Sequence, residues 1–169
     1  MASIISEGEK RQRLSELVSR FDTAMLVTRT DSGGIRARPL SIADSGEDGA
    51  LYFSTAIESP KVDELEQDPH VAVVMQSRRR YVSISGVAHL VRDRALIERL
   101  WSASWKIWFP QGKDDPSLCV LHVEPIEAAY WDMSGRQGVK YVFQMAKAFL
   151  TGTQPPSDQD ERHTARLKL

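Results

Sequence analysis

Residues 36–61 read RARPLSIADSGEDGALYFSTAIESPK and hold two short β-type runs, a turn and the start of a helix. Residues 35–43 predict one strand and residues 51–55 the next, because both are rich in strand-forming residues. The glycines in residues 45–49 supply the turn between them. Residues 59–61, Ser-Pro-Lys, predict a helix start, since serine suits the N-cap and proline the first helical position.

The rest of the chain continues this pattern of short strands with isolated helices. Further strands are expected at residues 23–28, 71–75, 81–92, 118–123 and 128–131, and helices at residues 7–21, 93–101 and 138–150. Gly86, inside a long strand, is expected at a bulge or bend. Short, closely spaced strands favour an antiparallel barrel over a doubly wound sheet. We therefore predict a mainly β fold of the α+β type, with about six or seven antiparallel strands and peripheral helices.

Length and composition indicate one ordinary globular domain. The chain has 169 residues, of which 41% are hydrophobic and 27% charged, so we expect a single domain over residues 1–150 and a polar C-terminal tail over residues 151–169. The last three residues, Leu-Lys-Leu, could dock onto the domain. Cys119 lies in an apolar run and is expected to be a core residue.

Charge and hydropathy argue against two classes of partner. The net charge is −1, so no overall field would draw the protein to nucleic acid or to an anionic membrane. No apolar run approaches the roughly 18 residues of a membrane span, and the N-terminus lacks the apolar core of a secretory signal. We expect a cytoplasmic protein.

Common catalytic motifs are absent from the sequence. The four histidines show no metal-ligand spacing with carboxylates or with Cys119, so no metal site is predicted. There is no Gly-x-Ser-x-Gly elbow, Walker loop or Gly-x-Gly-x-x-Gly fingerprint. The Asp114-Asp115-Pro116 stretch is typical of loop and turn chemistry. Catalytic residues therefore stay unassigned.

The start of the predicted helix at residue 59 is a candidate anion site. The hydroxyls of Thr55 and Ser59 and the ammonium of Lys61 would converge where a helix presents unpaired amides. These groups suit a phosphate monoester. Pro60 removes one amide donor, so the hydroxyls would matter more. The alternative, an ordinary capped surface helix, stays open on these residues alone.

The order and spacing of several motifs resemble those of a known family. Arg38-Pro39-Leu40, residues 53–55, residues 59–61 and residues 68–72 (DPHVA) are similar to the flavin-binding segment of pyridoxamine phosphate oxidase and its relatives. Three later stretches, residues 81–88 (YVSISGVA), 108–116 (WFPQGKDDP) and 129–132 (AYWD), together resemble the FMN-binding general stress proteins. The resemblance spans roughly residues 7–150 and implies an FMN-binding split β-barrel.

This resemblance also implies how the chain would hold flavin mononucleotide (FMN). Arg38 and the strand through Leu40 would lie along the isoalloxazine, and Thr55, Ser59 and Lys61 would hold the phosphate. Tyr81 falls where the oxidase has a polar flavin contact supplied by the partner subunit. The cofactor-binding residues predicted are Arg38, Pro39, Leu40, Ser54, Thr55, Ser59, Lys61, Tyr81, Trp108 and Trp131. A homodimer with the flavin at its interface follows from this division of contacts.

The expected function is an FMN-dependent oxidoreductase with an unknown small-molecule substrate. A non-catalytic flavin-binding stress or sensor protein is the alternative, and a deazaflavin-dependent reductase is a third possibility. The oxidase follows its tryptophan with an arginine and a histidine that grip the vitamin. Here residues 132–135, Asp-Met-Ser-Gly, follow Trp131, so oxidation of vitamin B6 phosphates is not expected.

Several residues have a second interpretation. Arg38 could form an interface salt bridge, and Trp101 fits the apolar face of a helix as core. Trp105 and Trp108 could cover a ligand or a partner chain, or fill a core or interface. Residues 78–80, Arg-Arg-Arg, fit a solvated hairpin tip better than a phosphate or nucleic-acid patch.

Overall fold

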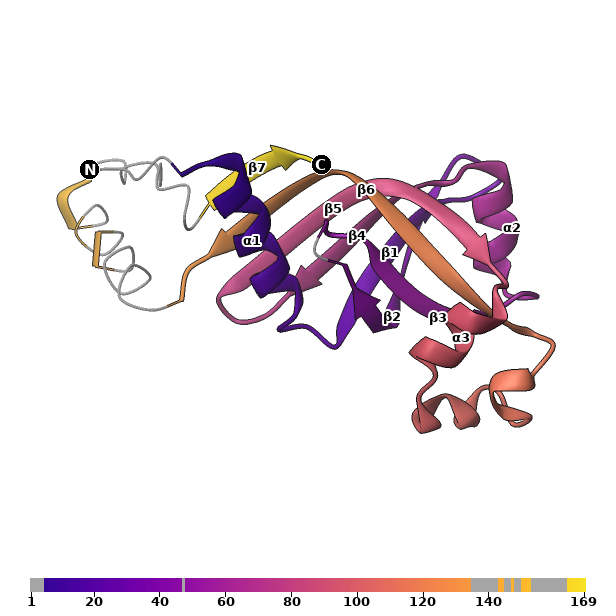
Figure 1. Cartoon of the computed structure of the whole chain (residues 1–169). Helices are drawn as coiled ribbons and strands as arrows, with labels where there is room; N and C mark the ends of the chain where they lie inside the picture. Colours follow the sequence, from indigo (N-terminus) through magenta and orange to yellow (C-terminus); the bar gives the residue numbers. More distant parts are fainter. Residues whose placement is uncertain (1–4, 47, 135–142, 145–146, 148–149, 153–163) are drawn as a thin grey trace.

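Seven strands form one antiparallel sheet, and six of them close into a barrel. This computed structural model describes residues 5–46, 48–134, 143–144, 147, 150–152 and 164–169. The strands are β1 (Thr23–Arg29), β2 (Ile35–Ser45), β3 (Leu51–Ala56), β4 (His70–Gln76), β5 (Arg80–Val91), β6 (Leu118–Asp132) and β7 (Thr164–Lys168). Their order is β3-β2-β1-β4-β5-β6-β7, and a further pairing of β3 with β6 closes the barrel (Figure 1). The predicted antiparallel barrel is confirmed.

Helices lie around the barrel. They are α1 (Glu7–Val18), α2 (Pro60–Gln67), α3 (Arg94–Leu100) and the 3-10 helices η1 (Ala103–Ile107) and η2 (Gly112–Asp114). Helix α1 lies toward one end of the barrel, whereas α2 and α3 lie toward the other (Figure 1). Leu14, Leu17 and Val18 of α1 join the barrel core. Helix α3 and η1 form a second apolar cluster with Leu118 and Val120 of β6. This second cluster places the α3–η2 segment beside the split of the barrel described below.

The two strands expected at residues 118–123 and 128–131 are one continuous strand, β6. The predicted division into two strands was therefore wrong. On one side β6 pairs with β3 through residues 118–123 and with β7 through residues 127–131. Pro125 falls between these two partners, so its missing amide costs no ladder bond on that side.

A bulge opposite Gly86 lets β5 and β6 stay paired along their whole length. The register shifts between Ser85 and Gly86, which confirms the predicted bulge. A Cβ on Gly86 would lie 2.2 Å from the carbonyl oxygen of Glu124, so only glycine fits without a backbone shift. The bulge also changes which residues of β6 are buried, from Leu121 and Val123 before it to Ala128 and Tyr130 after it.

The remaining predictions about the chain have mixed outcomes. The end of the tail docks as suggested, because β7 pairs with β6 and Leu167 is buried. The hairpin tip predicted at residues 78–80 lies at residues 77–79, because Arg80 already begins β5. The predicted burial of Cys119 is confirmed. The helix expected at residues 138–150 lies largely outside the described residues. None of the helices in the described ranges is both long and apolar enough to cross a bilayer.

Candidate functional site

The barrel is split where β2 and β3 diverge. On one side β2 pairs with β1 from Ile35 to Ser41. On its other side the pairing with β3 covers only residues 42–45. Strand β3 pairs with β6 along its whole length, so its end, from Ser54 to Ala56, keeps β6 as a partner but not β2. Residues 39–41 and 54–56 therefore face each other across a gap, and a proline is tolerated at position 39 because this stretch of β2 is an edge.

A cavity of about 570 Å³ opens at this split. Its lining comes from β2, β3, the start of α2 and the segment around η1, and consists of Pro39, Leu40, Ser41, Ser54, Thr55, Ala56, Ser59, Lys61, Ser104, Trp105, Ile107, Trp108 and Phe109. Seven of the ten predicted cofactor-binding residues are among them. This volume falls in the range of small-molecule sites. Lys61 is the one titratable side chain in this described lining, so the cavity offers no carboxylate or imidazole for acid–base chemistry.

The cavity lining includes the predicted phosphate-binding groups. Lys61 Nζ donates to Thr55 Oγ1 at 2.8 Å and to Ser59 Oγ at 3.0 Å, and the two hydroxyl oxygens are 3.3 Å apart. Ser59 occupies the N-cap position of α2 but makes no side-chain cap bond. The predicted capping role is therefore wrong for its hydroxyl, because that group turns toward Lys61 instead.

The charge of Lys61 is not neutralised at short range by any residue that the structure describes. In the described ranges no carboxylate oxygen lies within 4.0 Å of its Nζ. Burial, and then repulsion by Arg38, hold the pKa of Lys61 below its ordinary value. A half-buried ammonium held by two hydroxyls, without a carboxylate, is a suitable site for an anion.

Arg38 faces a different set of groups. Its guanidinium donates to Glu64 Oε2 at 2.5 Å and to the hydroxyl of Thr28. Arg36 pairs with the other oxygen of Glu64, also at 2.5 Å. Burial alone would raise the pKa of Glu64, but the hydrogen bonds from Thr28 and Arg38 and the charges of Arg38 and Arg36 outweigh it and lower the pKa. Arg38 does not line the cavity, whereas its neighbours Pro39 and Leu40 do. Sequence reasoning missed Glu64, which lies one helical turn beyond Lys61.

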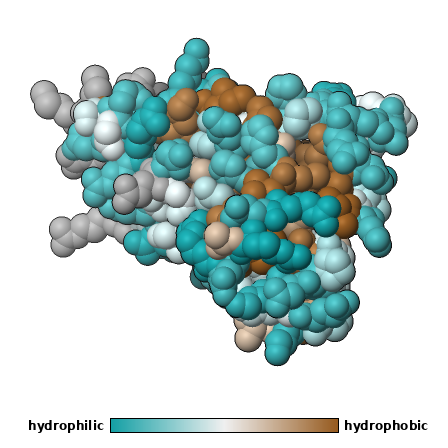
Figure 2. Space-filling model, turned by 45° about the vertical axis from the view of Figure 1, so that its right-hand side comes forward, coloured by the Kyte–Doolittle hydropathy of each residue, from teal (hydrophilic) through white to brown (hydrophobic). Residues whose placement is uncertain are grey.

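Tyr81 and Trp131 also lie outside the lining of this cavity. They are direct partners in the β5–β6 ladder, and Trp131 is 42% exposed. Met25 and Val74, partners in the β1–β4 ladder, are exposed to a similar degree. Figure 2 shows hydrophobic surface gathered through the middle of the view and bordered by polar residues. The structure thus brings Tyr81 and Trp131 together, but not onto their own chain's cavity.

The segment around η1 forms the apolar wall of the cavity. Trp105 and Phe109 are buried in the cluster with α3, as expected of fillers. Ile107 and Trp108 line the same cavity, yet each is 78% exposed. Ile107 and Phe109 were not predicted as site residues, although they flank Trp108 in the sequence. Two large apolar side chains at the mouth of a cavity are placed to cover whatever fills it.

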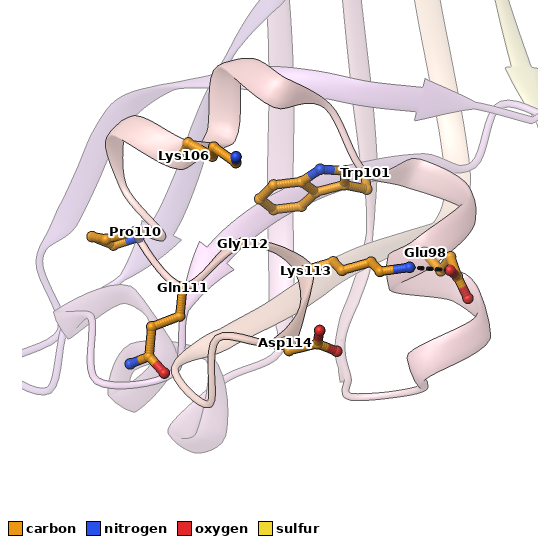
Figure 3. A pocket seen from close by; sticks show the side chains of 8 residues that line it. All are labelled: Glu98, Trp101, Lys106, Pro110, Gln111, Gly112, Lys113 and Asp114. Atoms are coloured by element: carbon orange, nitrogen blue, oxygen red, sulfur yellow. Dashed lines mark hydrogen bonds and ion pairs between the residues drawn. The ribbon is translucent and has the colours of Figure 1, made fainter.

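A second hollow lies between α3, η1 and η2 (Figure 3). Its volume is about 460 Å³, and Trp101 lies within it (Figure 3). Trp101 packs edge-on against Trp105, with ring centroids 5.6 Å apart. Lys113 forms an ion pair with Glu98 across the hollow. This pairing leaves the hollow less suited to an anion than the cavity at Lys61. Asp115 has the turn role predicted for it, since it accepts from Ser117.

Sequence and structure comparisons agree on the kind of protein. Residues 9–156 match the family described as pyridoxamine 5'-phosphate oxidase like. Protein bli-3 of Neurospora crassa is 28% identical over 156 residues, covering 85% of this chain and 74% of that protein. General stress protein 26 of Bacillus subtilis is 25% identical over 126 residues, covering 72% of this chain and 87% of that protein.

A solved structure adds a cofactor to the comparison. The general stress FMN/FAD binding protein of Xanthomonas citri is 26% identical, with a TM-score of 0.61, covering 76% of this chain and 89% of that one. The family match covers most of the chain, and the split barrel with its cavity agrees with it. The chain belongs to the pyridoxamine 5'-phosphate oxidase-like family.

Proposed function

We propose that this protein binds FMN in the cavity at the split of the barrel and acts as an FMN-dependent oxidoreductase. The observation that carries the proposal is the mixed lining of this cavity. The lining combines the cluster of Thr55, Ser59 and Lys61 with the aromatic side chains of Trp105 and Trp108. A phosphate monoester with a flat aromatic body matches both kinds of group.

The residues of the chain would bind and shield the cofactor and would not perform the chemistry themselves. Lys61 would neutralise phosphate charge, while the two hydroxyls donate to its oxygens. The edge of β2 at residues 39–41 would border the ring system, and Trp108 would exclude water from its face. When bound, a flavin supplies hydride and electron chemistry, which suits a cavity without a carboxylate or imidazole in its described lining.

The proposal includes a homodimer that shares the site. Tyr81 and Trp131 lie on the outer face of the barrel, away from their own cavity, and Trp131 is 42% exposed. Exposed apolar residues on a sheet face are typical of an interface between chains. Light scattering should report a dimer, and dilution should release flavin because both chains supply contacts. A monomer that keeps FMN at nanomolar protein concentration contradicts this part of the proposal.

A cytoplasmic location also belongs to the proposal. The one cysteine of the sequence, Cys119, is buried, and burial raises the pKa of its thiol. It is therefore a packing residue, and the fold requires no oxidising compartment. Fractionation of cells that express the tagged chain would test this location.

Cofactor titration followed by nicotinamide addition tests the function. FMN should bind, its fluorescence should change, and a reduced nicotinamide nucleotide should bleach the bound flavin under anaerobic conditions. Bound FMN that stays oxidised favours the alternative of a flavin-binding stress or sensor protein without turnover. Uptake of a deazaflavin in preference to FMN would favour the third possibility, a deazaflavin-dependent reductase. Failure to bind any flavin contradicts the proposal.

A further inference from the structure

The hairpin between β4 and β5 presents two arginines without a partner on the described part of the chain. Arg78 and Arg79 are both exposed, and neither guanidinium takes part in an ion pair there. The next residue differs, because Arg80 faces the buried Asp132 at 3.5 Å. Asp132 also pairs with Arg13 of α1. This end of the barrel is therefore rich in guanidinium groups, and two of them are free to bind an anion.

The backbone holds this hairpin in place. The amide of Ser77 donates to the carbonyl of Arg80 at 2.8 Å. The amide of Met133 donates to the carbonyl of Arg79 at 2.8 Å, which ties the tip to the end of β6. A tip with anchors on two sides positions its side chains better than a free loop, so the cost of ordering them around a ligand is reduced.

Two aromatic residues follow the hairpin in the β5–β6 ladder. Tyr81 follows Arg80 on β5 and pairs with the exposed Trp131 on β6. Trp131 is exposed and Tyr81 is half-buried, and an exposed indole is a surface on which a flat heterocycle can stack. Guanidinium groups bind phosphate oxygens in pairs of hydrogen bonds. A ring surface and two free guanidinium groups together match a nucleotide.

We propose that Arg78 and Arg79, with Tyr81 and Trp131, form a nucleotide-binding surface that receives a phosphorylated nicotinamide electron donor. This rests on the proposed function, in which Tyr81 and Trp131 of one chain face the flavin held by its partner. The hairpin arginines then lie at the rim of that shared site. The nicotinamide enters over the flavin, and its phosphate groups stay outside on Arg78 and Arg79.

The test uses the FMN-loaded full chain and oxidised NADP⁺ as the probe, because no turnover is then needed. Replacing Arg78 and Arg79 together by glutamine should weaken NADP⁺ binding by roughly 10- to 100-fold in calorimetry. The affinity for FMN and the melting temperature should stay as in wild type. Arg29→Gln is the matched control, since this exposed arginine lies at the end of β1 that is farther from the β4–β5 hairpin and pairs with Asp68.

A second measurement separates phosphate recognition from ring binding. Bleaching of the flavin by 1-benzyl-1,4-dihydronicotinamide, a donor without phosphates, should proceed equally in wild type and in the double variant. Unchanged NADP⁺ affinity in a double variant that binds FMN normally would overturn this inference and leave the proposed function standing. Tighter binding of a random single-stranded oligonucleotide than of NADP⁺ would overturn it as well. If wild type binds no FMN, it is the proposed function that fails.

Discussion

Replacing Lys61 by methionine separates a ligand-binding role of this lysine from a role in folding. The native pKa of Lys61 is lowered, mainly by burial and then by Arg38, so its ionised form opposes folding at every pH below that native pKa. The contribution of Lys61 to the free energy of unfolding becomes more favourable as the pH rises from its pKa in the native state to its pKa in the unfolded state. Methionine keeps the length of the stem without the charge. The ligand-free variant should therefore unfold within about 0.5 kcal/mol of wild type, or be more stable.

The affinity for FMN should fall in the Lys61→Met variant, although the stability of the ligand-free protein should not. Lys61 would give the phosphate a charge-assisted hydrogen bond, whose loss costs roughly 1.5–3 kcal/mol, or about 10- to 150-fold in affinity. Riboflavin has no phosphate and should bind wild type and variant equally. The wild-type affinity for FMN should also fall as the pH rises through the lowered pKa of Lys61. The variant should lack that alkaline loss.

Flavin fluorescence titrations and thermal unfolding of the ligand-free protein measure both effects. Lys106→Met is the matched control, because Lys106 lies on the same 3-10 helix segment as the cavity wall but lines the second hollow. Wild-type FMN affinity in the Lys61 variant would refute the phosphate assignment. An equal loss of FMN and riboflavin would refute it too, since the variant would then have disturbed the whole cavity.

Three further outcomes are expected. Glu64→Gln should lower the free energy of unfolding by about 3–5 kcal/mol at pH 7, since the buried carboxylate joins two arginines. Because the native pKa of Glu64 is lowered, wild type should lose this advantage over the variant as the pH falls below about 4. Urea titrations of both proteins at several pH values measure the difference. Gly86→Ala should lower the free energy of unfolding by about 3 kcal/mol or more in a urea titration, because the new Cβ would lie 2.2 Å from a backbone oxygen. Gly8→Ala is the control and should cause no such loss, since its Cβ would lie 3.9 Å from the nearest atom. The flavin-loaded protein should not form pyridoxal phosphate from pyridoxamine or pyridoxine phosphate under oxygen, because residues 132–135, Asp-Met-Ser-Gly, supply no arginine or histidine beside Trp131 to grip the vitamer. Turnover near one per second would contradict this.

Local signals predicted the strands and the helix start well, because these depend on short runs of residues. The two strands and the turn in residues 36–61 and the bulge at Gly86 all follow from propensity and turn chemistry. The cluster of Thr55, Ser59 and Lys61 was predicted in the same way, because the end of one strand and the start of the next helix bring these residues together within seven positions.

Partners that are distant in sequence could not be predicted in the same way. Two strands were predicted at residues 118–123 and 128–131, and only the change of partner from β3 to β7 explains why β6 continues through Pro125. Likewise, nothing near Arg38 in the sequence shows that Glu64 takes its guanidinium. The Ser59 hydroxyl, expected to cap α2, turns to a lysine that the same motif supplies.

The position of the cavity follows from where the pairing of β2 with β3 ends. Strand β3 pairs with β6 along its whole length, Leu51–Ala56, but pairs with β2 only as far as Phe53. The stretch of β2 at residues 39–41 then keeps an edge whose polar backbone groups need partners, from water or from a ligand. A planar heterocycle with donors and acceptors along one side can pair with such an edge where another strand cannot fit. The same divergence exposes the end of β3 and the start of α2, where the hydroxyls and Lys61 lie. The early end of the β2–β3 ladder therefore creates the binding site, and a substitution that restored β2–β3 pairing beyond Phe53 would remove it.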